Sequence, residues 1–106
     1  MEIFSKILTS VDINKGLEIP HDRCDDVLAE LQITGQRMEI LVVDMQGNPW
    51  NFVCFTKSGN KQLPKPVFKK GWLEFACHWN LAAGTTITFY KEIDQATGAQ
   101  YKIRVR

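Results

Sequence analysis

Short strand-like segments that alternate with turn residues are the feature that most constrains the fold of this 106-residue chain. Seven segments are rich in β-branched and aromatic residues, and they are separated by breakers such as Gly16, Pro20 and the turn at 46–49. The segments are residues 4–9, 17–19, 36–44, 50–55, 62–68, 85–90 and 101–105. Strand edges leave backbone N–H and C=O groups unpaired, so many short strands favour a closed or nearly closed β-barrel.

Two further stretches, residues 21–31 and 71–80, place apolar side chains at helical spacing. Aromatic and aliphatic side chains at regular spacing are expected to form the core, since each removes a large area from water. The expected core comprises Phe4, Leu8, Ile19, Trp50, Phe52, Trp72, Phe75, Trp79, Leu81, Ile87 and Phe89. We therefore predict one mainly β domain over residues 1–106, with seven strands and two short flanking α-helices.

Charge is distributed unevenly along the chain, although the formal net charge is only +1. Residues 1–47 hold four basic and nine acidic side chains, a net charge of −5. Residues 48–106 hold nine basic and three acidic side chains, a net charge of +6, and five lysines with no acid fall between residues 57 and 70. A nearly neutral total can hide a positive face that attracts a polyanion, although a solvated surface explains such a lysine run equally well.

Catalytic and metal-binding arrangements find little support in the sequence. His21 and Cys24 lie one helical turn apart, and Cys77 adjoins His78, but neither pair has the spacing of a zinc site or of a nucleophile and its base. Three cysteines without a CxxC motif predict reduced, mostly buried thiols. We therefore expect no enzyme activity, no metal and no small-molecule cofactor.

Two polar segments are the remaining candidates for a binding site. Residues 9–16 offer hydroxyl, carboxylate, amide and ammonium groups, and residues 56–62 offer a second set with two lysines. Lysine binds phosphate with release of counterions, whereas Asn, Ser and Asp can pair with base edges. Polar loops also simply keep small barrels soluble, so the residues alone leave both interpretations open.

Five fragments follow one another in a fixed order along nearly the whole chain. They are Phe4-x-Lys6-x-Leu8-Thr9-x-x-Asp12, Leu17-x-Ile19-Pro20, Trp50-x-Phe52, Lys70-Gly71-Trp72-x-x-Phe75 and Leu81-x-x-Gly84-x-x-Ile87-x-Phe89. Their order and spacing resemble those of the plant B3 DNA-binding domain. The resemblance implies a seven-stranded open β-barrel (a pseudobarrel) with two flanking helices. It also implies that the chain is the DNA-binding module of a nuclear plant transcription regulator.

The resemblance also implies a DNA-contacting surface on two arms that enter the major groove. The N-arm of a B3 domain lies between its first and second strands, and the C-arm lies between its fourth and fifth; by order these are residues 9–16 and 57–62 here. The predicted DNA-binding residues are Lys6, Thr9, Ser10, Asp12, Asn14, Lys15, Lys57, Ser58, Asn60, Lys61 and Lys70. The lysines are expected to hold phosphates, and the serines, the asparagines and Asp12 are expected to lie near base edges.

The sequence departs from the family pattern at three places. His21 stands where a basic residue usually follows Ile-Pro, and Thr85 stands where an acidic residue usually follows the glycine of Leu-x-x-Gly. The C-arm, Lys57-Ser58-Gly59-Asn60-Lys61, lacks the arginine- or tryptophan-containing pattern of the auxin response factors and of the seed-maturation and RAV-type groups. We therefore predict a weakly selective binder that contacts mainly the DNA backbone, like the divergent reproductive-meristem group.

Double-stranded DNA is the predicted partner, with possible protein partners reached through regions outside this chain. No membrane partner is expected, because no apolar run approaches the ~18 residues of a membrane span, and the N-terminal residues lack the pattern of a signal peptide. Two alternatives remain: the DNA-recognition domain of a restriction endonuclease that shares the fold, and a barrel that binds protein or sugar. A fused nuclease domain would favour the first, and binding that is insensitive to salt would favour the second.

Overall fold

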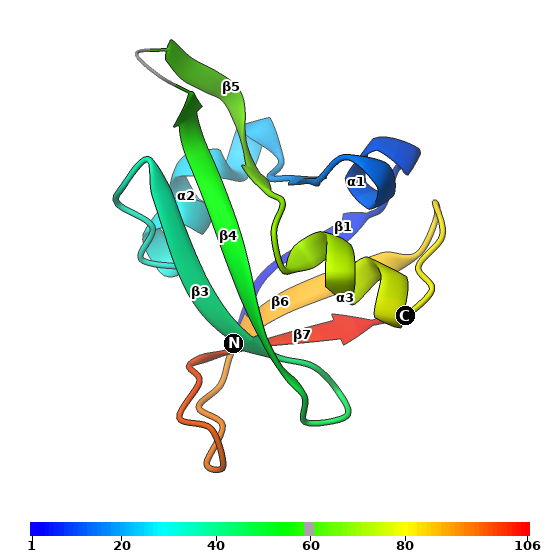
Figure 1. Cartoon of the computed structure of the whole chain (residues 1–106). Coiled ribbons are helices and arrows are strands. Elements are labelled where there is room, and N and C mark those ends of the chain that lie inside the picture. The colour runs from blue at the N-terminus through cyan, green and yellow to red at the C-terminus, as the bar shows by residue number, and fades with distance from the viewer. Residues whose placement is uncertain (59–60) are drawn as a thin grey trace.

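Seven strands form one curled sheet in the computed structural model, which describes residues 1–58 and 61–106, without the side chains of His21 and residues 57–64 (Figure 1). The strands are β1 (Glu2–Ile7), β2 (Leu17–Glu18), β3 (Arg37–Val43), β4 (Pro49–Ser58), β5 (Lys61–Phe68), β6 (Thr86–Lys91) and β7 (Tyr101–Val105). Their order across the sheet is β1-β6-β7-β3-β4-β5-β2, and all neighbours run antiparallel except β3 and β7. The sheet ends on β1 and β2, so the predicted open seven-stranded barrel is confirmed.

Three α-helices and one 3-10 helix connect these strands in the described part of the chain, where the sequence predicted two helices. The helical segments are α1 (Ser10–Asn14), η1 (His21–Arg23), α2 (Cys24–Glu30) and α3 (Trp72–His78). The additional helix is α1, in the segment predicted to be a loop. Thr9 and Asp12 form a capping box, in which the Thr9 hydroxyl accepts from the Asp12 N–H and the Asp12 carboxylate accepts from the Thr9 N–H. These two bonds satisfy backbone donors that would otherwise be free at the start of a helix.

The β4–β5 hairpin is longer than predicted. Residues 56–61 were expected to form a loop, but Lys57 pairs with Gln62 and Ser58 pairs with Lys61 in the antiparallel ladder. The prolines of β5 were expected on an edge strand or an irregular segment. The outer edge of β5 pairs only with the two-residue β2, so most of this strand lies at an edge, where proline is tolerated.

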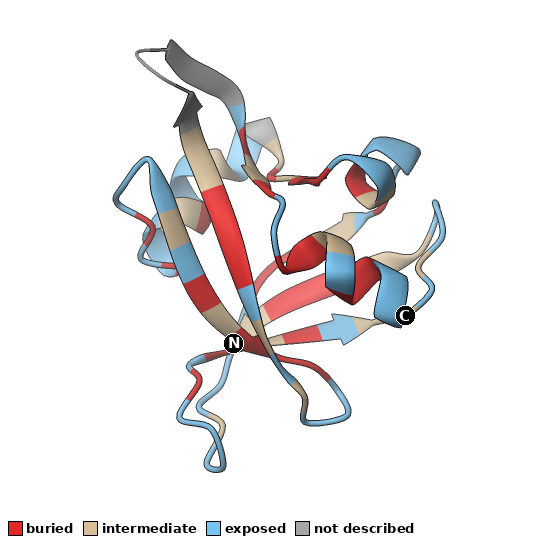
Figure 2. Cartoon of the chain, in the orientation of Figure 1, coloured by how far each residue is buried: buried red, intermediate tan, exposed pale blue. Residues whose placement is uncertain are grey.

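Aromatic side chains fill the interior of the barrel, where the buried residues of several strands and of α3 face one another (Figure 2). Phe52 lies at the centre, with its ring centroid 5.9 Å from that of Trp72, 5.6 Å from that of Phe75 and 6.0 Å from that of Phe89. The expected core residues that are buried are Phe4, Leu8, Ile19, Phe52, Trp72, Phe75, Ile87 and Phe89. Those that are only partly buried are Trp50, Trp79 and Leu81.

The thiols differ from the prediction of mostly buried cysteines. All three are free, but only Cys54 is buried, while Cys24 is half-buried and Cys77 is exposed on α3. Burial, with a smaller contribution from the neighbouring Cys24, raises the pKa of Cys54 to about 12. Cys77 departs from the prediction because the apolar face of α3 is occupied by Trp72, Phe75 and Ala76, which turns position 77 outward.

A buried carboxylate, Asp44, links the β3–β4 turn to α3. It accepts hydrogen bonds from the backbone N–H groups of Gln46 and Asn48, both at 2.9 Å, and from the indole N–H groups of Trp50 at 2.9 Å and Trp79 at 3.1 Å. Burial acts to raise the pKa of Asp44, but these hydrogen bonds outweigh it and hold the pKa below its ordinary value. The two partly buried tryptophans therefore serve as donors as well as packing groups.

Gly71, which precedes α3, can be used to test whether close packing of the backbone against β4 stabilises the fold. Its φ of +84° is unfavourable for other residues, and a Cβ there would overlap the Asn51 carbonyl oxygen and lie 2.7 Å from the carbonyl carbon. We predict that Gly71→Ala lowers the free energy of unfolding by roughly 3–5 kcal/mol, from backbone strain plus overpacking. Gly47→Ala is the matched control, since Gly47 has the same φ but no atom within 4 Å of the added carbon. Its expected cost in urea unfolding is only about 1–2 kcal/mol, and equal losses in the two variants would contradict the packing argument.

Candidate nucleic-acid interface

The segments predicted as arms, α1 and the β4–β5 hairpin, are joined at one end of the barrel through β2 (Figure 1). Strand β2 follows α1 after a turn of two residues, Lys15 and Gly16, and its own two residues, Leu17 and Glu18, pair with the end of β5. The turn between α1 and β2 touches β5, because a Cβ on Gly16 would lie 2.8 Å from Val67 Cγ2 and 2.9 Å from the Phe68 carbonyl oxygen. The absence of a side chain at Gly16 therefore allows α1 to sit against β5.

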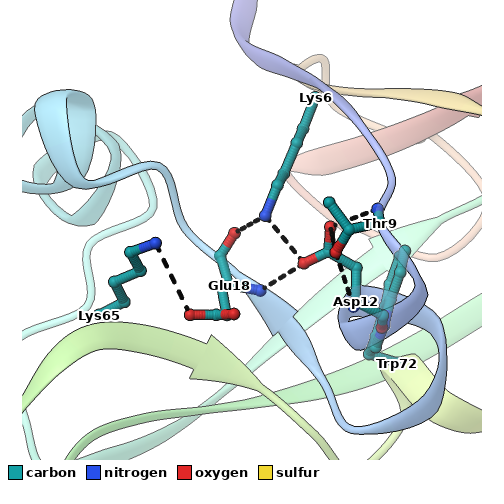
Figure 3. A network of polar contacts seen from close by, with 6 residues as sticks. All are labelled: Lys6, Thr9, Asp12, Glu18, Lys65 and Trp72. Carbon is teal, nitrogen blue, oxygen red and sulfur yellow. Dashed lines mark hydrogen bonds and ion pairs between the residues drawn. The ribbon is translucent and has the colours of Figure 1, made fainter. Parts of the chain in front are cut away.

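A polar network anchors α1 to the two strands that flank it (Figure 3). Lys6 Nζ lies 2.8 Å from Asp12 Oδ1 and donates a second hydrogen bond to the Glu18 carbonyl oxygen at 2.7 Å. The Glu18 N–H donates to Asp12 Oδ1 at 3.1 Å, and the Thr9 N–H donates to Asp12 Oδ2 at 2.8 Å. A lysine on β1, an aspartate on α1 and the backbone of β2 thus form one unit.

Asp12 is the centre of this network, and its side chain is 0% exposed. Burial alone acts to raise the pKa of this carboxyl group. The hydrogen bonds from Lys6, Thr9 and Glu18, together with the charge of Lys6, outweigh burial and hold the pKa of Asp12 below its ordinary value of 3.8. The Asp12 carbonyl oxygen also accepts a 2.7 Å hydrogen bond from Trp72 Nε1, which connects α1 to α3.

The predicted site residues fall into three groups by position. Lys6, Thr9 and Asp12 make the internal bonds described above, and because the Asp12 side chain is fully buried, a direct contact of Asp12 with DNA requires its bonds to break. Exposed on the N-arm or beside α3 are Ser10, Asn14, Lys15 and Lys70. Lys57, Ser58 and Lys61 lie on the β4–β5 hairpin, where only their backbone is described, and Asn60 lies outside the described residues. DNA contact by any of these residues stays a prediction.

A hollow of about 260 Å³ lies between α1 and β5. Its lining residues are Val11, Lys15, Gly16, Glu18, Lys65, Val67 and Lys69. Three lysines thus meet at one concave surface, with a single carboxylate whose Oε2 lies 4.0 Å from Lys65 Nζ. The hollow therefore lies between the N-arm and β5, the strand that follows the C-arm.

Lys65 and Lys69 were not among the predicted site residues. Residues 62–68 were expected to form an edge strand or an irregular segment because of their prolines. The alternation of side chains between the two faces of a regular strand was therefore not expected there. In the structure Pro66 and Phe68 are buried, while Lys65 and Lys69 are exposed and Val67 is half-buried. The period of two in Lys65-x-Val67-x-Lys69 was the signal that could have found this surface.

The described residues contain no group of three or more His, Cys, Asp or Glu side chains arranged to hold a metal ion. None of the helices in the described part of the chain is both long and apolar enough to span a membrane. The candidate interface consists of the lysine-lined hollow, the exposed polar side chains of α1 and the β4–β5 hairpin.

The Lys6–Asp12 pair can be tested by removing one partner. We predict that Lys6→Met lowers the free energy of unfolding by about 3–5 kcal/mol, because a buried carboxylate is left without its counter-charge. Lys65→Met is the control, since the Lys65 side chain is 48% exposed and its contact with Glu18 is long. Its expected change is below about 1 kcal/mol in urea unfolding. Similar losses in both variants would show that the ion pair does not anchor α1.

Acid should remove stability that depends on Asp12 and Asp44. Both pKa values are lower in the folded chain than their ordinary 3.8, so the stabilisation is complete above that pH and is lost as pH falls toward the folded values. We expect the free energy of unfolding to decline below about pH 4. Asp44→Asn should make this decline shallower in urea titrations at pH 6, 4 and 3. An unchanged decline would show that Asp44 does not contribute.

Comparisons with known proteins identify the fold and the family of this chain. The family model of the B3 DNA binding domain matches residues 4–106, while no curated protein matches the sequence. The structure of the FUS3–DNA complex from Arabidopsis superposes with a TM-score of 0.74 at 20% identity, covering 100% of this chain and 97% of the other. A hypothetical protein of Arabidopsis thaliana superposes with a TM-score of 0.61 at 22% identity, covering 97% and 85%. The structural matches show a shared fold, and the family match shows that this chain belongs to the B3 DNA-binding domain family.

Proposed function

We propose that this B3 domain binds double-stranded DNA in the major groove through α1 and the β4–β5 hairpin, as the DNA-binding module of a plant transcription regulator acting in the nucleus. The observation that carries the proposal is the joining of α1 to β5, which puts Lys15, Lys65 and Lys69 around one hollow. The major groove of B-DNA is about 12 Å wide and admits an α-helix. Family membership and the DNA-bound state of the FUS3 relative support the same assignment.

Phosphate attraction is assigned to the lysines of both arms. Lys15, Lys65 and Lys69 are exposed around the hollow, and the charge of each can replace condensed counterions on a duplex. The lysines Lys57, Lys61 and Lys70 are proposed to extend this contact, as the sequence predicted. Such contacts fix where the domain sits on the duplex but carry no direct information about base sequence.

Base contacts are assigned to the exposed polar side chains of the arms. Ser10 and Asn14 are exposed on α1, and Ser58 and Asn60 are proposed to act from the hairpin. Lys6, Thr9 and Asp12 instead act as positioning residues, because they hold α1 in the orientation that presents its outer face. This assignment gives Asp12 a positioning role in place of the expected base contact, while Lys6, whose ammonium group has a third N–H, can still reach a phosphate.

Selectivity among sequences is proposed to be weak. Bidentate pairing of arginine with guanine is the commonest specific major-groove contact, and α1, β4 and β5 contain no arginine. Three of the arginines of this chain are used elsewhere: Arg23 donates to the Ile3 carbonyl oxygen, Arg37 stacks over Phe55 and Arg104 stacks over Tyr90. Lysine contacts with few base-specific partners favour a backbone-dominated binder.

Charge reversal tests the two arms separately. We predict that Lys57→Glu with Lys61→Glu, and equally Lys65→Glu with Lys69→Glu, abolishes duplex binding at modest salt while the barrel remains folded. The matched control is Lys91→Glu with Arg106→Glu, which changes the net charge equally at exposed positions outside the hollow. Unchanged affinity in an arm variant, or an equal loss in the control, would contradict the assignment.

The salt dependence of binding tests the proposed phosphate contacts themselves. Each phosphate neutralised by a lysine contributes about 0.9 to the slope of log K against log salt concentration. Lys65→Gln with Lys69→Gln should therefore reduce the slope by about 2. Measurement of fluorescence anisotropy at several salt concentrations gives the slope, and a slope equal to that of the unaltered protein would remove both lysines from the interface.

A further inference from the structure

The hollow between α1 and β5 contains an apolar part that phosphate binding does not explain. Val11 is 43% exposed, and of the large hydrophobic side chains exposed in the described part of the chain it alone lines this hollow. Val67, half-buried, lines the same surface from β5. Two valines thus stand among Lys15, Lys65 and Lys69, so a ligand that enters the hollow meets methyl groups as well as ammonium groups.

Val11 is held in place by the bonds on either side of it. Its carbonyl oxygen accepts from the Lys15 N–H at 2.9 Å and the Gly16 N–H at 3.2 Å. The next residue, Asp12, is fixed by the polar network of Figure 3. An apolar group held in this way needs little further ordering to make a contact, which limits the entropic cost of binding.

The charged and the apolar side chains of the hollow offer separate contacts to a duplex. Its three ammonium groups outnumber the single Glu18 carboxylate, so the hollow attracts anions, and the long lysine side chains can reach phosphates beside it. The two valines offer no hydrogen-bond partner to a phosphate and match an apolar group instead. In the major groove, the apolar group displayed by the base edges is the C5-methyl group of thymine.

We propose that Val11 and Val67 form a subsite for the 5-methyl group of thymine, so that the domain prefers an A·T pair where α1 enters the major groove. This inference rests on the proposed function and adds a preference that the missing arginines do not provide. In this proposal Val11 determines specificity through an apolar contact with a base, whereas the lysines contact the phosphates of the DNA backbone.

Deoxyuridine provides the test, because it lacks the methyl group but keeps the pairing edge of thymine. The probe is a 20-base-pair duplex recovered from a random pool on the purified protein, then synthesised with each thymine replaced in turn by deoxyuridine. We expect one or two positions to lose about fourfold in affinity, the factor that corresponds to one buried methyl group. Val11→Ser, which removes both methyl groups of the side chain, should remove most of that difference.

The control variant is Ile93→Ser, at an exposed apolar residue between β6 and β7, and it should retain the full preference for thymine. Melting temperatures verify that both variants are folded. Equal affinity for thymine and deoxyuridine at every position, or a recovered duplex without thymine, overturns the subsite and leaves the proposed function standing. Full discrimination by Val11→Ser removes the assignment to this hollow. Absence of binding to any duplex overturns the proposed function and the subsite together.

Discussion

Asp12 is the residue on which the arrangement of β1, α1 and β2 depends. Its carboxylate accepts hydrogen bonds from Lys6, Thr9 and Glu18, and its carbonyl oxygen accepts one from Trp72. Removing two charges from water costs solvation free energy, which their attraction offsets only when the geometry is good and the remaining lone pairs have donors. Both carboxylate oxygens have donors here, so the ion pair can be buried. Its main effect is to fix the position of α1, since an apolar replacement could stabilise the fold equally well.

This anchoring changes how the N-arm would act in the proposed complex. A flexible loop loses conformational entropy when it binds, whereas the backbone of α1 is already ordered by its capping box and by Lys6. The lysines around the hollow keep long side chains at an exposed surface, where they can adapt to phosphates at different positions. A fixed helix surrounded by adaptable cations suits contact with the DNA backbone, and it leaves base discrimination to short side chains on α1 and the hairpin.

The sequence predicted the barrel better than it predicted the site. Aromatic residues such as Phe52 and Trp72 marked the core, since large apolar side chains at regular spacing have few alternatives to burial. The polar composition of residues 9–16 hid the helix α1, because a capping aspartate and a base-contacting aspartate look alike in sequence. Only the folded chain shows that Asp12 faces Lys6 and that Lys65 lines the same hollow as Lys15, because these arrangements depend on how the chain folds back on itself. The charge of the lysine run was visible in the sequence, but the surface it forms was not.

The pairing of β1 with β6 has a consequence for how the chain acquires its structure. Glu2 lies opposite Tyr90, and β6 in turn pairs with β7, so the first strand has no partner until most of these 106 residues are available. Contacts between residues so distant in sequence must close large loops, and proteins dominated by them fold slowly. During synthesis on the ribosome, β1 therefore has no partner strand until β6 has been made. Completion of the sheet thus depends on its last two strands, although β1 also carries Lys6, which anchors α1.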